Sequence, residues 1–156
     1  HLLDAFLLSA VPLATDSERQ RNSNPRKLYP ADPGLIKAFD TSGRSNLGHA
    51  LETAVLNELE RRGADVGYVK AGAGLEVDFL ARWPAAGEEL IQVCADLSSP
   101  ETRARELRAL TAAAQDHPRA ALRLLALDRD ARAQAGAAGI DVQPAYEWLL
   151  AAPDQN

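Results

Sequence analysis

The sequence has little of several residue types, and each shortage excludes a class of protein. Its 156 residues include one cysteine and no methionine, and only 5% are aromatic. A single thiol forms neither an internal disulfide nor a cysteine-rich metal cluster, so secretion has no support and we expect a cytoplasmic location. Because the chain begins at His1 and lacks methionine, we expect it to be a fragment or a trimmed product of a longer protein.

Long hydrophobic runs are also missing. The apolar opening is interrupted by Asp4 and is too short to cross a bilayer, so we expect a core element there and no membrane partner. The pattern Gly-x-x-x-x-Gly-Lys-Ser/Thr does not occur, so the sequence has no P-loop. The glycines at 72 and 74 fall between two predicted strands, which indicates a turn and not a phosphate site.

Positive charge is scarce in the middle of the chain. The formal net charge is -5, and residues 45–100 hold nine acidic and four basic side chains. Nonspecific DNA binding depends on Lys and Arg neutralising phosphates, so strong binding of that kind is not expected. Arg103, Arg105 and Arg108 are the best basic cluster, which we interpret as a solvated face, with a phosphate or partner contact as the alternative.

Periodicity and capping residues predict one mixed α/β domain over 1–156, with 1–44 as an N-terminal extension of the core. The clearest helix spans 45–62, where Leu and Val recur every four residues between a Ser45 cap and Gly63. A second helix starts at Ser99-Pro100 and stops before Pro118. The polar run 15–25 predicts a loop. Further strands are predicted at 26–30, 66–71, 75–82, 89–95, 121–127 and 140–142, and short helices at 33–39, 129–135 and 145–150.

The order of the central elements is helix, strand, strand, strand, helix, strand. A meander followed by a crossover helix indicates a mixed sheet covered by helices. An N-terminal hairpin and a C-terminal strand and helix add to this core. Several folds share this order, so the order alone does not identify a function.

One predicted strand concentrates acidic residues. Period-two alternation over 75–81 places Glu76 and Asp78 on one face, and Val77 and Phe79 on the other. A solvated strand face and a weak metal site both explain such a pair of carboxylates.

Three further positions are candidates to join Asp78. If the strand 89–95 pairs with 75–82, Gln92 and Cys94 face Asp78. Glu52 lies at the border of the core-facing stripe of the long helix, where a carboxylate seldom occurs without a partner. We therefore expect Glu52 and Asp78 to meet near the end of the sheet. Cys94 is interpreted as a small buried residue, and His49 as a surface or satisfied histidine.

These segments resemble the C-terminal domain of unknown function that many prokaryotic AAA-type ATPases carry. The resemblance covers nearly the whole chain, and its most specific part is the Glu-Val-Asp-Phe strand with the helix before it. The matching segments are Asn24 to Tyr29, Asp32 to Leu35, Leu51 to Leu59, Gly74 to Phe79, Gly139 to Pro144 and Trp148 to Leu150.

That family is similar to the PD-(D/E)xK, or restriction endonuclease-like, fold. The resemblance implies that Asp78 matches the metal-binding aspartate of such nucleases and Glu52 the helix glutamate, with Mg²⁺ as the metal. The sequence departs from the pattern on the next strand, where Gln92 and Cys94 stand in place of the Glu and Lys of Glu-x-Lys. We therefore predict that Glu52, Asp78, Gln92 and Cys94 are vestigial site positions. Asp78 and Glu52 are the candidate metal ligands, and we expect them to bind metal weakly or not at all.

Three functions follow as hypotheses. The leading one is a non-catalytic accessory domain of an upstream ATPase that recognises a protein partner or a substrate such as nucleic acid, with no cofactor. The second is a divergent Mg²⁺-dependent nuclease that uses Glu52 and Asp78, with Lys70 replacing the lost lysine. The third is an assembly module, in which the first ten residues and the helix at Trp148 contact the ATPase or another copy of the chain.

Overall fold

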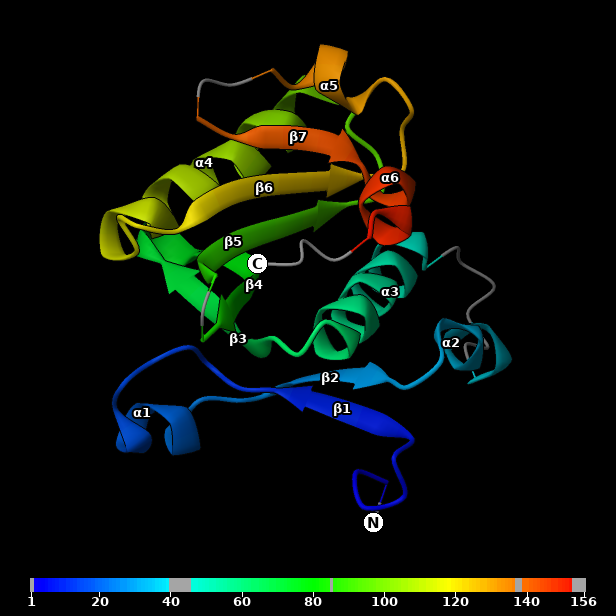
Figure 1. Ribbon diagram of the computed structural model, residues 1–156, viewed down its shortest axis with the longest axis vertical. Helices are drawn as coiled ribbons and strands as arrows, with labels where there is room; N and C mark the ends of the chain where they lie inside the picture. Colours follow the sequence, from blue (N-terminus) through cyan, green and yellow to red (C-terminus); the bar gives the residue numbers. More distant parts are fainter. Residues whose placement is uncertain (1, 40–45, 85, 137–138, 153–156) are drawn as a thin grey trace.

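A five-stranded mixed sheet lies at the centre of the molecule (Figure 1). The computed structural model describes residues 2–39, 46–84, 86–136 and 139–152. In spatial order the strands are β3 (Asp65–Ala71), β4 (Leu75–Trp83), β5 (Gly87–Cys94), β6 (Ala121–Ala126) and β7 (Asp141–Pro144). Strands β3, β4 and β5 pair antiparallel, whereas β5, β6 and β7 pair parallel. The predicted mixed sheet is confirmed.

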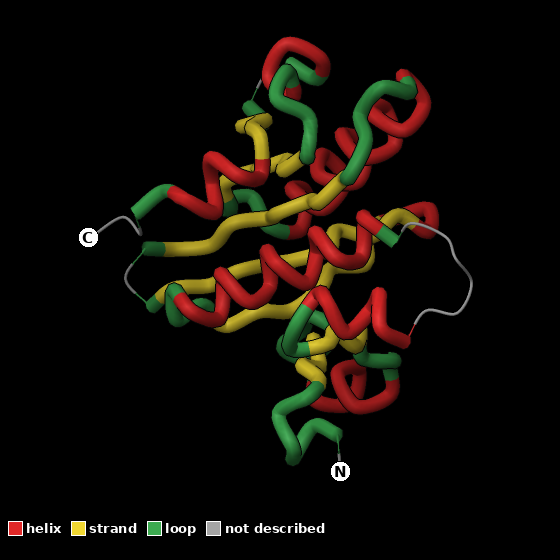
Figure 2. The backbone as a smooth tube through the Cα atoms, turned by 90° about the vertical axis from the view of Figure 1, so that its right-hand side faces the viewer, coloured by secondary structure: helices red, strands yellow, loops and turns green. Residues whose placement is uncertain are grey.

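Helices cover both faces of this sheet, as the turned view in Figure 2 also shows. Helix α3 (Leu47–Arg61) packs on the face that holds Phe79 and Ile91, together with α6 (Ala145–Leu150). Helix α4 (Pro100–Asp116) packs on the face that holds Leu80 and Leu90, and α5 (Ala131–Gln134) lies beside β7. Neighbouring strand residues point to opposite faces, so strands β3 to β6 each contribute to two separate cores.

The start of α4 and the end of α3 lie where the capping residues in the sequence predicted them. Gly63 follows α3 with a φ of 77°, a left-handed conformation that ends a helix and favours glycine. The predicted cap Ser45 lies outside the described residues, and Leu47, predicted to begin the apolar stripe, is exposed. Ser99 caps α4 by accepting a hydrogen bond from the backbone N–H of Thr102.

An N-terminal arm, residues 8–31, lies along the edge of the sheet beside β3. It contains β1 (Leu8–Val11), α1 (Glu18–Ser23) and β2 (Lys27–Pro30), and α2 (Pro33–Phe39) follows it. Backbone hydrogen bonds join the arm to Tyr68 of β3, whose N–H donates to Pro12 and whose carbonyl accepts from Ala14. A Cβ at Gly67 would come within 2.9 Å of the Ala14 Cβ, so the arm approaches closely because this position is glycine.

The prediction of a loop over 15–25 was wrong, because α1 forms inside it. Ser17 accepts a hydrogen bond from the N–H of Gln20, and the side chain of Asn24 donates to the Gln20 carbonyl at 2.8 Å. These local side-chain contacts stabilise a helix of six residues that has no apolar periodicity to reveal it.

Strict alternation along β4 was also wrong, because the strand contains a bulge. Gly67 pairs with Leu80 and Val69 pairs with Val77, so β4 has one more residue than β3 between these pairs. Val77 consequently joins the same core cluster as Leu80, while Phe79 belongs to the cluster on the other face. Such a bulge redirects the side chains beside it, and Asp78 lies within it.

No helix among the described residues is both long enough and apolar enough to cross a lipid bilayer.

Candidate functional site

A cavity of about 330 Å³ lies where β4 and β5 stop pairing through their backbones. Residues from α3, β4, β5 and α4 line it, so it is reached from both helical layers. We call it the acidic pocket, because four carboxylates are part of its wall. They are Glu52, Glu76, Asp78 and Glu106.

Asp78 is buried and makes two hydrogen bonds to β5, each of which involves a side chain in place of a backbone group. Its Oδ2 accepts a hydrogen bond from the N–H of Val93 at 3.1 Å, and its own N–H donates to the side-chain Oε1 of Gln92 at 3.2 Å. Side chains thus join β4 and β5 just beyond the last backbone pair, Phe79 with Ile91. The predicted contact between Asp78 and Gln92 is present.

Lys27, a cation of the N-terminal arm, forms an ion pair with Asp78. The Nζ of Lys27 lies 3.1 Å from the Oδ1 of Asp78 and 2.7 Å from the Oε1 of Glu76. It also lies 5.5 Å from the centroid of the Tyr68 ring. Sequence reasoning missed this residue because 51 positions separate Lys27 from Asp78. One signal was available, since alternation along β2 places Lys27 on the same side as the buried Tyr29.

Gln92 extends the network to the opposite helix. Its Nε2 donates to the Oε2 of Glu106 at 2.7 Å, and the other oxygen of Glu106 accepts from Arg105 at 2.5 Å. Glu106 is buried, although its sequence neighbours Arg105 and Arg108 are exposed, as the predicted solvated face requires. Its spacing from Ala109 and Leu110 places it on the buried side of α4, and this signal was in the sequence.

Glu52 enters the pocket from α3. Its Oε2 accepts a hydrogen bond from the hydroxyl of Tyr29 at 2.9 Å, and the Tyr29 ring stacks on His49 with centroids 5.1 Å apart. The stack agrees with our interpretation of His49 as a satisfied histidine. Glu52 and Asp78 therefore line one cavity, as the position of Glu52 on its helix predicted.

The pocket changes the acidity of its members. Burial, and then the nearby charge of Glu52, raises the pKa of Asp78 to about 6. Burial also raises the pKa of Glu52. Burial alone would lower the pKa of Lys27, but the carboxylates of Asp78 and Glu76 outweigh it and raise that pKa above its ordinary value. The arrangement therefore favours a charged Lys27 beside Asp78, whose raised pKa means that it releases its proton late.

The described residues do not fit a divalent metal. Mg²⁺ takes oxygen ligands in near-octahedral geometry, and protein donors that already hold a carboxylate compete with it. Both oxygens of Asp78 and both oxygens of Glu106 are engaged by donors of the protein. Across the described ranges, no three His, Cys, Asp or Glu side chains are placed to hold a metal ion.

Two residues from the sequence hypotheses lie away from Asp78. The exposed Lys70 donates to Oδ1 of Asn24 at 2.8 Å, so the ammonium beside Asp78 belongs to Lys27 instead. Cys94 is buried, as expected, and its thiol donates to the carbonyl of Asp96 at 3.2 Å. Burial raises the pKa of the Cys94 thiol, which keeps it protonated. That Glu52, Asp78, Gln92 and Cys94 are vestigial site positions stays a prediction.

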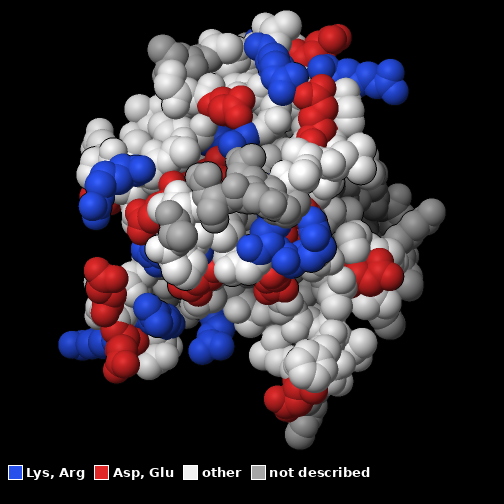
Figure 3. Space-filling view, in the orientation of Figure 1, with Lys and Arg blue, Asp and Glu red and all other residues white. Residues whose placement is uncertain are grey.

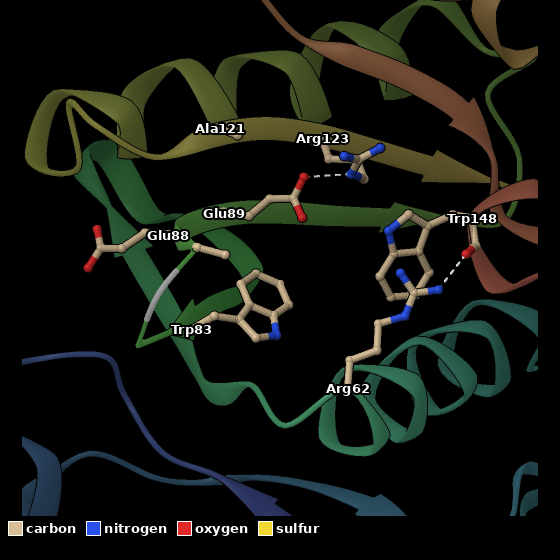
Figure 4. A pocket seen from close by; sticks show the side chains of 8 residues that line it. Arg62, Trp83, Glu88, Glu89, Ala121, Arg123 and Trp148 are labelled. Carbon is tan, nitrogen blue, oxygen red and sulfur yellow. Dashed lines mark hydrogen bonds and ion pairs between the residues drawn. The ribbon is translucent and has the colours of Figure 1, made fainter. Parts of the chain in front are cut away.

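A second cavity, of about 270 Å³, lies near the turn between β4 and β5 (Figure 4). Trp83 and Trp148 stand on opposite sides of it, and the Arg62 guanidinium lies 4.4 Å from the Trp148 ring. Above them Arg123 donates to Glu89 at 2.6 Å. We call this the tryptophan pocket. Each of its charged side chains has an ion-pair partner, which is typical of a structural contact: Glu89 pairs with Arg123, whereas Glu88 and Arg62 pair with Arg82 and Glu58 outside the cavity wall.

The face shown in Figure 3 does not point to a polyanion. Its basic side chains form small separate clusters, and acidic side chains lie next to them. On α4, Arg103 donates to the carbonyl of Leu97 and Arg105 pairs with Glu106, while Arg108 is exposed. Comparisons with known proteins found no matching family model, no matching curated protein and no matching solved structure.

Proposed function

We propose that this chain is a nuclease-like domain that has lost catalysis and that serves an AAA-type ATPase as an accessory module for recognition. The fold supports this proposal through its order of elements. Helix α3, the meander of β3 to β5, the crossover helix α4 and the parallel strand β6 follow the order expected of a restriction endonuclease-like core. The acidic pocket also brings together Asp78 and Glu52, the two carboxyl groups that the resemblance matches to such an active site.

The observation that carries the loss of catalysis is the occupation of Asp78. One oxygen accepts from Lys27 and the other from the N–H of Val93. A metal ion would have to compete with these donors, and with the positive charge of Lys27, for the carboxylate. The two positions where a nuclease supplies its second acid and its lysine hold Gln92 and Cys94. Gln92 is already bonded to Glu106, and the buried thiol supplies no cation.

A nuclease assay tests the loss of catalysis. The purified chain is incubated with Mg²⁺ or Mn²⁺ and end-labelled single-stranded and double-stranded DNA and RNA. We expect no more cleavage than from the Asp78→Ala variant purified in parallel. Cleavage by the wild-type chain that disappears in Asp78→Ala would overturn the proposal.

Recognition is tested separately, by binding. An AAA-type ATPase domain from a protein of the resembled family, and fluorescent oligonucleotides, are titrated with the chain. Saturable binding of either without cleavage supports the accessory role. Binding of neither, together with a stable dimer in light scattering, would replace the proposal by the assembly module.

A divergent nuclease is the second candidate, and one observation favours it. Lys27 supplies a cation beside Asp78, and Glu106 supplies a further carboxylate in the same cavity. These two side chains come from different elements than the expected Glu-x-Lys, but they bring the same chemical groups. If the wild-type chain cleaves, Lys27→Met and Glu106→Gln should each abolish cleavage. Full activity in both variants would exclude this candidate.

A further inference from the structure

We propose that the acidic pocket is a binding site for a primary ammonium group, and that Lys27 of the N-terminal arm is its resident ligand. This inference rests on the proposed loss of catalysis, because the ammonium takes the charge-balancing place that a metal has in a working nuclease site. The pocket then holds the arm against the core.

The first support is the match between the pocket and a compact cation. Two carboxylate oxygens approach the Nζ of Lys27, at 2.7 Å from Glu76 and 3.1 Å from Asp78. A third side of the ammonium faces the Tyr68 ring. An ammonium is a point charge with donors in three directions, and an aromatic face attracts such a charge. A planar guanidinium directs its donors in one plane and does not suit this arrangement.

The second support is that the arm positions Lys27 through contacts on both sides of it. Before Lys27, the carbonyl of Pro25 accepts a hydrogen bond from the Tyr68 hydroxyl at 2.8 Å. After it, Tyr29 donates to Glu52, and the carbonyl of Ala31 accepts from Asn57 at 2.9 Å. The residues around Lys27 are therefore fixed on the core, and the ammonium is delivered to the pocket in one geometry.

The third support is the charge balance of the pocket. Glu106 has its own cation in Arg105, but Glu52, Glu76 and Asp78 share the field of Lys27. Removing Lys27 leaves Asp78 buried beside Glu52 without its ion-pair partner, which is costly in a site of low polarity. The side chain of Lys27 is 24% exposed, so a small cation from solvent can reach the place that a truncated residue leaves.

Chemical rescue tests the site. Amide hydrogen exchange over residues 27–31 is compared in the wild type, Lys27→Ala and Lys70→Ala, the matched control with an exposed lysine that donates to Asn24 of the arm. We expect exchange to be about tenfold faster in Lys27→Ala and little changed in Lys70→Ala. Methylammonium should slow the exchange of Lys27→Ala again, whereas guanidinium at equal ionic strength should not.

Two outcomes would overturn the inference. One is exchange in Lys27→Ala that equals the wild type. The other is rescue of Lys27→Ala by Mn²⁺ and not by methylammonium, which would make the pocket a metal site.

A measurement on the wild type avoids the folding of variants. Reductive methylation followed by mass spectrometry should modify Lys27 roughly tenfold more slowly than the exposed Lys70, because a paired ammonium seldom loses its proton. Equal rates would overturn this inference and leave the absence of cleavage untouched. Conversely, metal-dependent cleavage would overturn the proposed function, whatever the rate at Lys27.

Discussion

Two of the three glutamates on helix α3 have surroundings that shift their pKa values in opposite directions. In the acidic pocket, Glu52 has the Tyr29 hydroxyl as its hydrogen-bond donor, and burial raises its pKa. Beside the tryptophan pocket, hydrogen bonds from Arg61 and then from Arg62 lower the pKa of Glu58 to about 2. The difference reflects the balance of cations and carboxylates in the two regions. Arginines match the carboxylates near the tryptophan pocket, whereas carboxylates outnumber cations in the acidic pocket, as is typical of functional sites.

The largest expected effect comes from removing an arginine beside the tryptophan pocket. The Arg62 side chain donates to Glu58 and to the carbonyls of Trp148 and Ala151, and it stacks on the Trp148 ring. Arg62→Met should lower the free energy of unfolding by about 3 kcal/mol, because it leaves a mostly buried carboxylate and two carbonyls without this donor. Urea denaturation measures it. The exposed neighbour Arg61 also contacts Glu58, and Arg61→Met, the control, should change stability little. Equal losses of stability in Arg62→Met and Arg61→Met would contradict the greater structural role given to Arg62.

The pH dependence of stability distinguishes the two regions, because raising the pH lowers the contribution of Asp78 to stability and raises that of Glu58. Asp78 has a pKa of about 6 when folded against 3.8 ordinarily, so the folded state binds more protons between these values. Its contribution to the free energy of unfolding should fall by up to about 3 kcal/mol as pH rises from about 4 to 6. Glu58, at about 2 against 4.5, acts oppositely, and its contribution rises from about pH 2 to 4.5.

Urea denaturation across this pH range distinguishes the two groups. Asp78→Asn should flatten the fall above about pH 4, to which Glu52 also contributes through its own raised pKa. Glu58→Gln should flatten the rise below about pH 4.5. A wild-type profile that Asp78→Asn leaves unchanged would show that Asp78 does not titrate late.

A smaller effect tests whether the acidic pocket depends on the arm. Gly67→Ala places a methyl group against Ala14 and should cost about 1–2 kcal/mol as the arm shifts from β3. Hydrogen exchange should become faster in the arm and stay unchanged around Trp148. Gly72 faces open space, so Gly72→Ala is the matched control and should leave the arm unaffected. Faster exchange around Trp148 as well would mean that the two regions are coupled.

The smallest effect lies within the acidic pocket. Glu52→Gln removes a negative charge that raises the pKa of Asp78, while the amide oxygen still accepts from Tyr29. The pKa of Asp78 should fall by a fraction of a unit, measured by carbon-detected NMR of its carboxyl group. An unchanged titration would mean that burial alone sets the acidity.

Much of the fold could be predicted from local patterns. Helix α4 follows from Ser99, Pro100 and the spacing of Leu107 and Leu110, because capping and periodicity act within a few residues. The succession of strands along the chain follows in the same way, from local alternation and turn residues. The bulge in β4 could not be predicted, because it depends on how β3 pairs opposite it.

The candidate site was predictable only in part. Asp78, Gln92 and Glu52 follow from strand alternation and helix position, since neighbouring strands bring such residues together. Lys27 comes from an arm whose path depends on backbone bonds to Tyr68, and no local pattern encodes that path. Glu106 has the spacing of a core residue, but its charge suggested the surface.

The contact between Val93 and Asp78 gives the molecule a built-in reporter. The amide N–H of Val93 donates to a carboxyl group whose pKa lies near 6, and not to a carbonyl that keeps the same charge at every pH. The proton signal of this one amide therefore records the charge of the pocket directly. In a ¹⁵N spectrum it would register the departure of Lys27 or the arrival of another cation, without a label at the site.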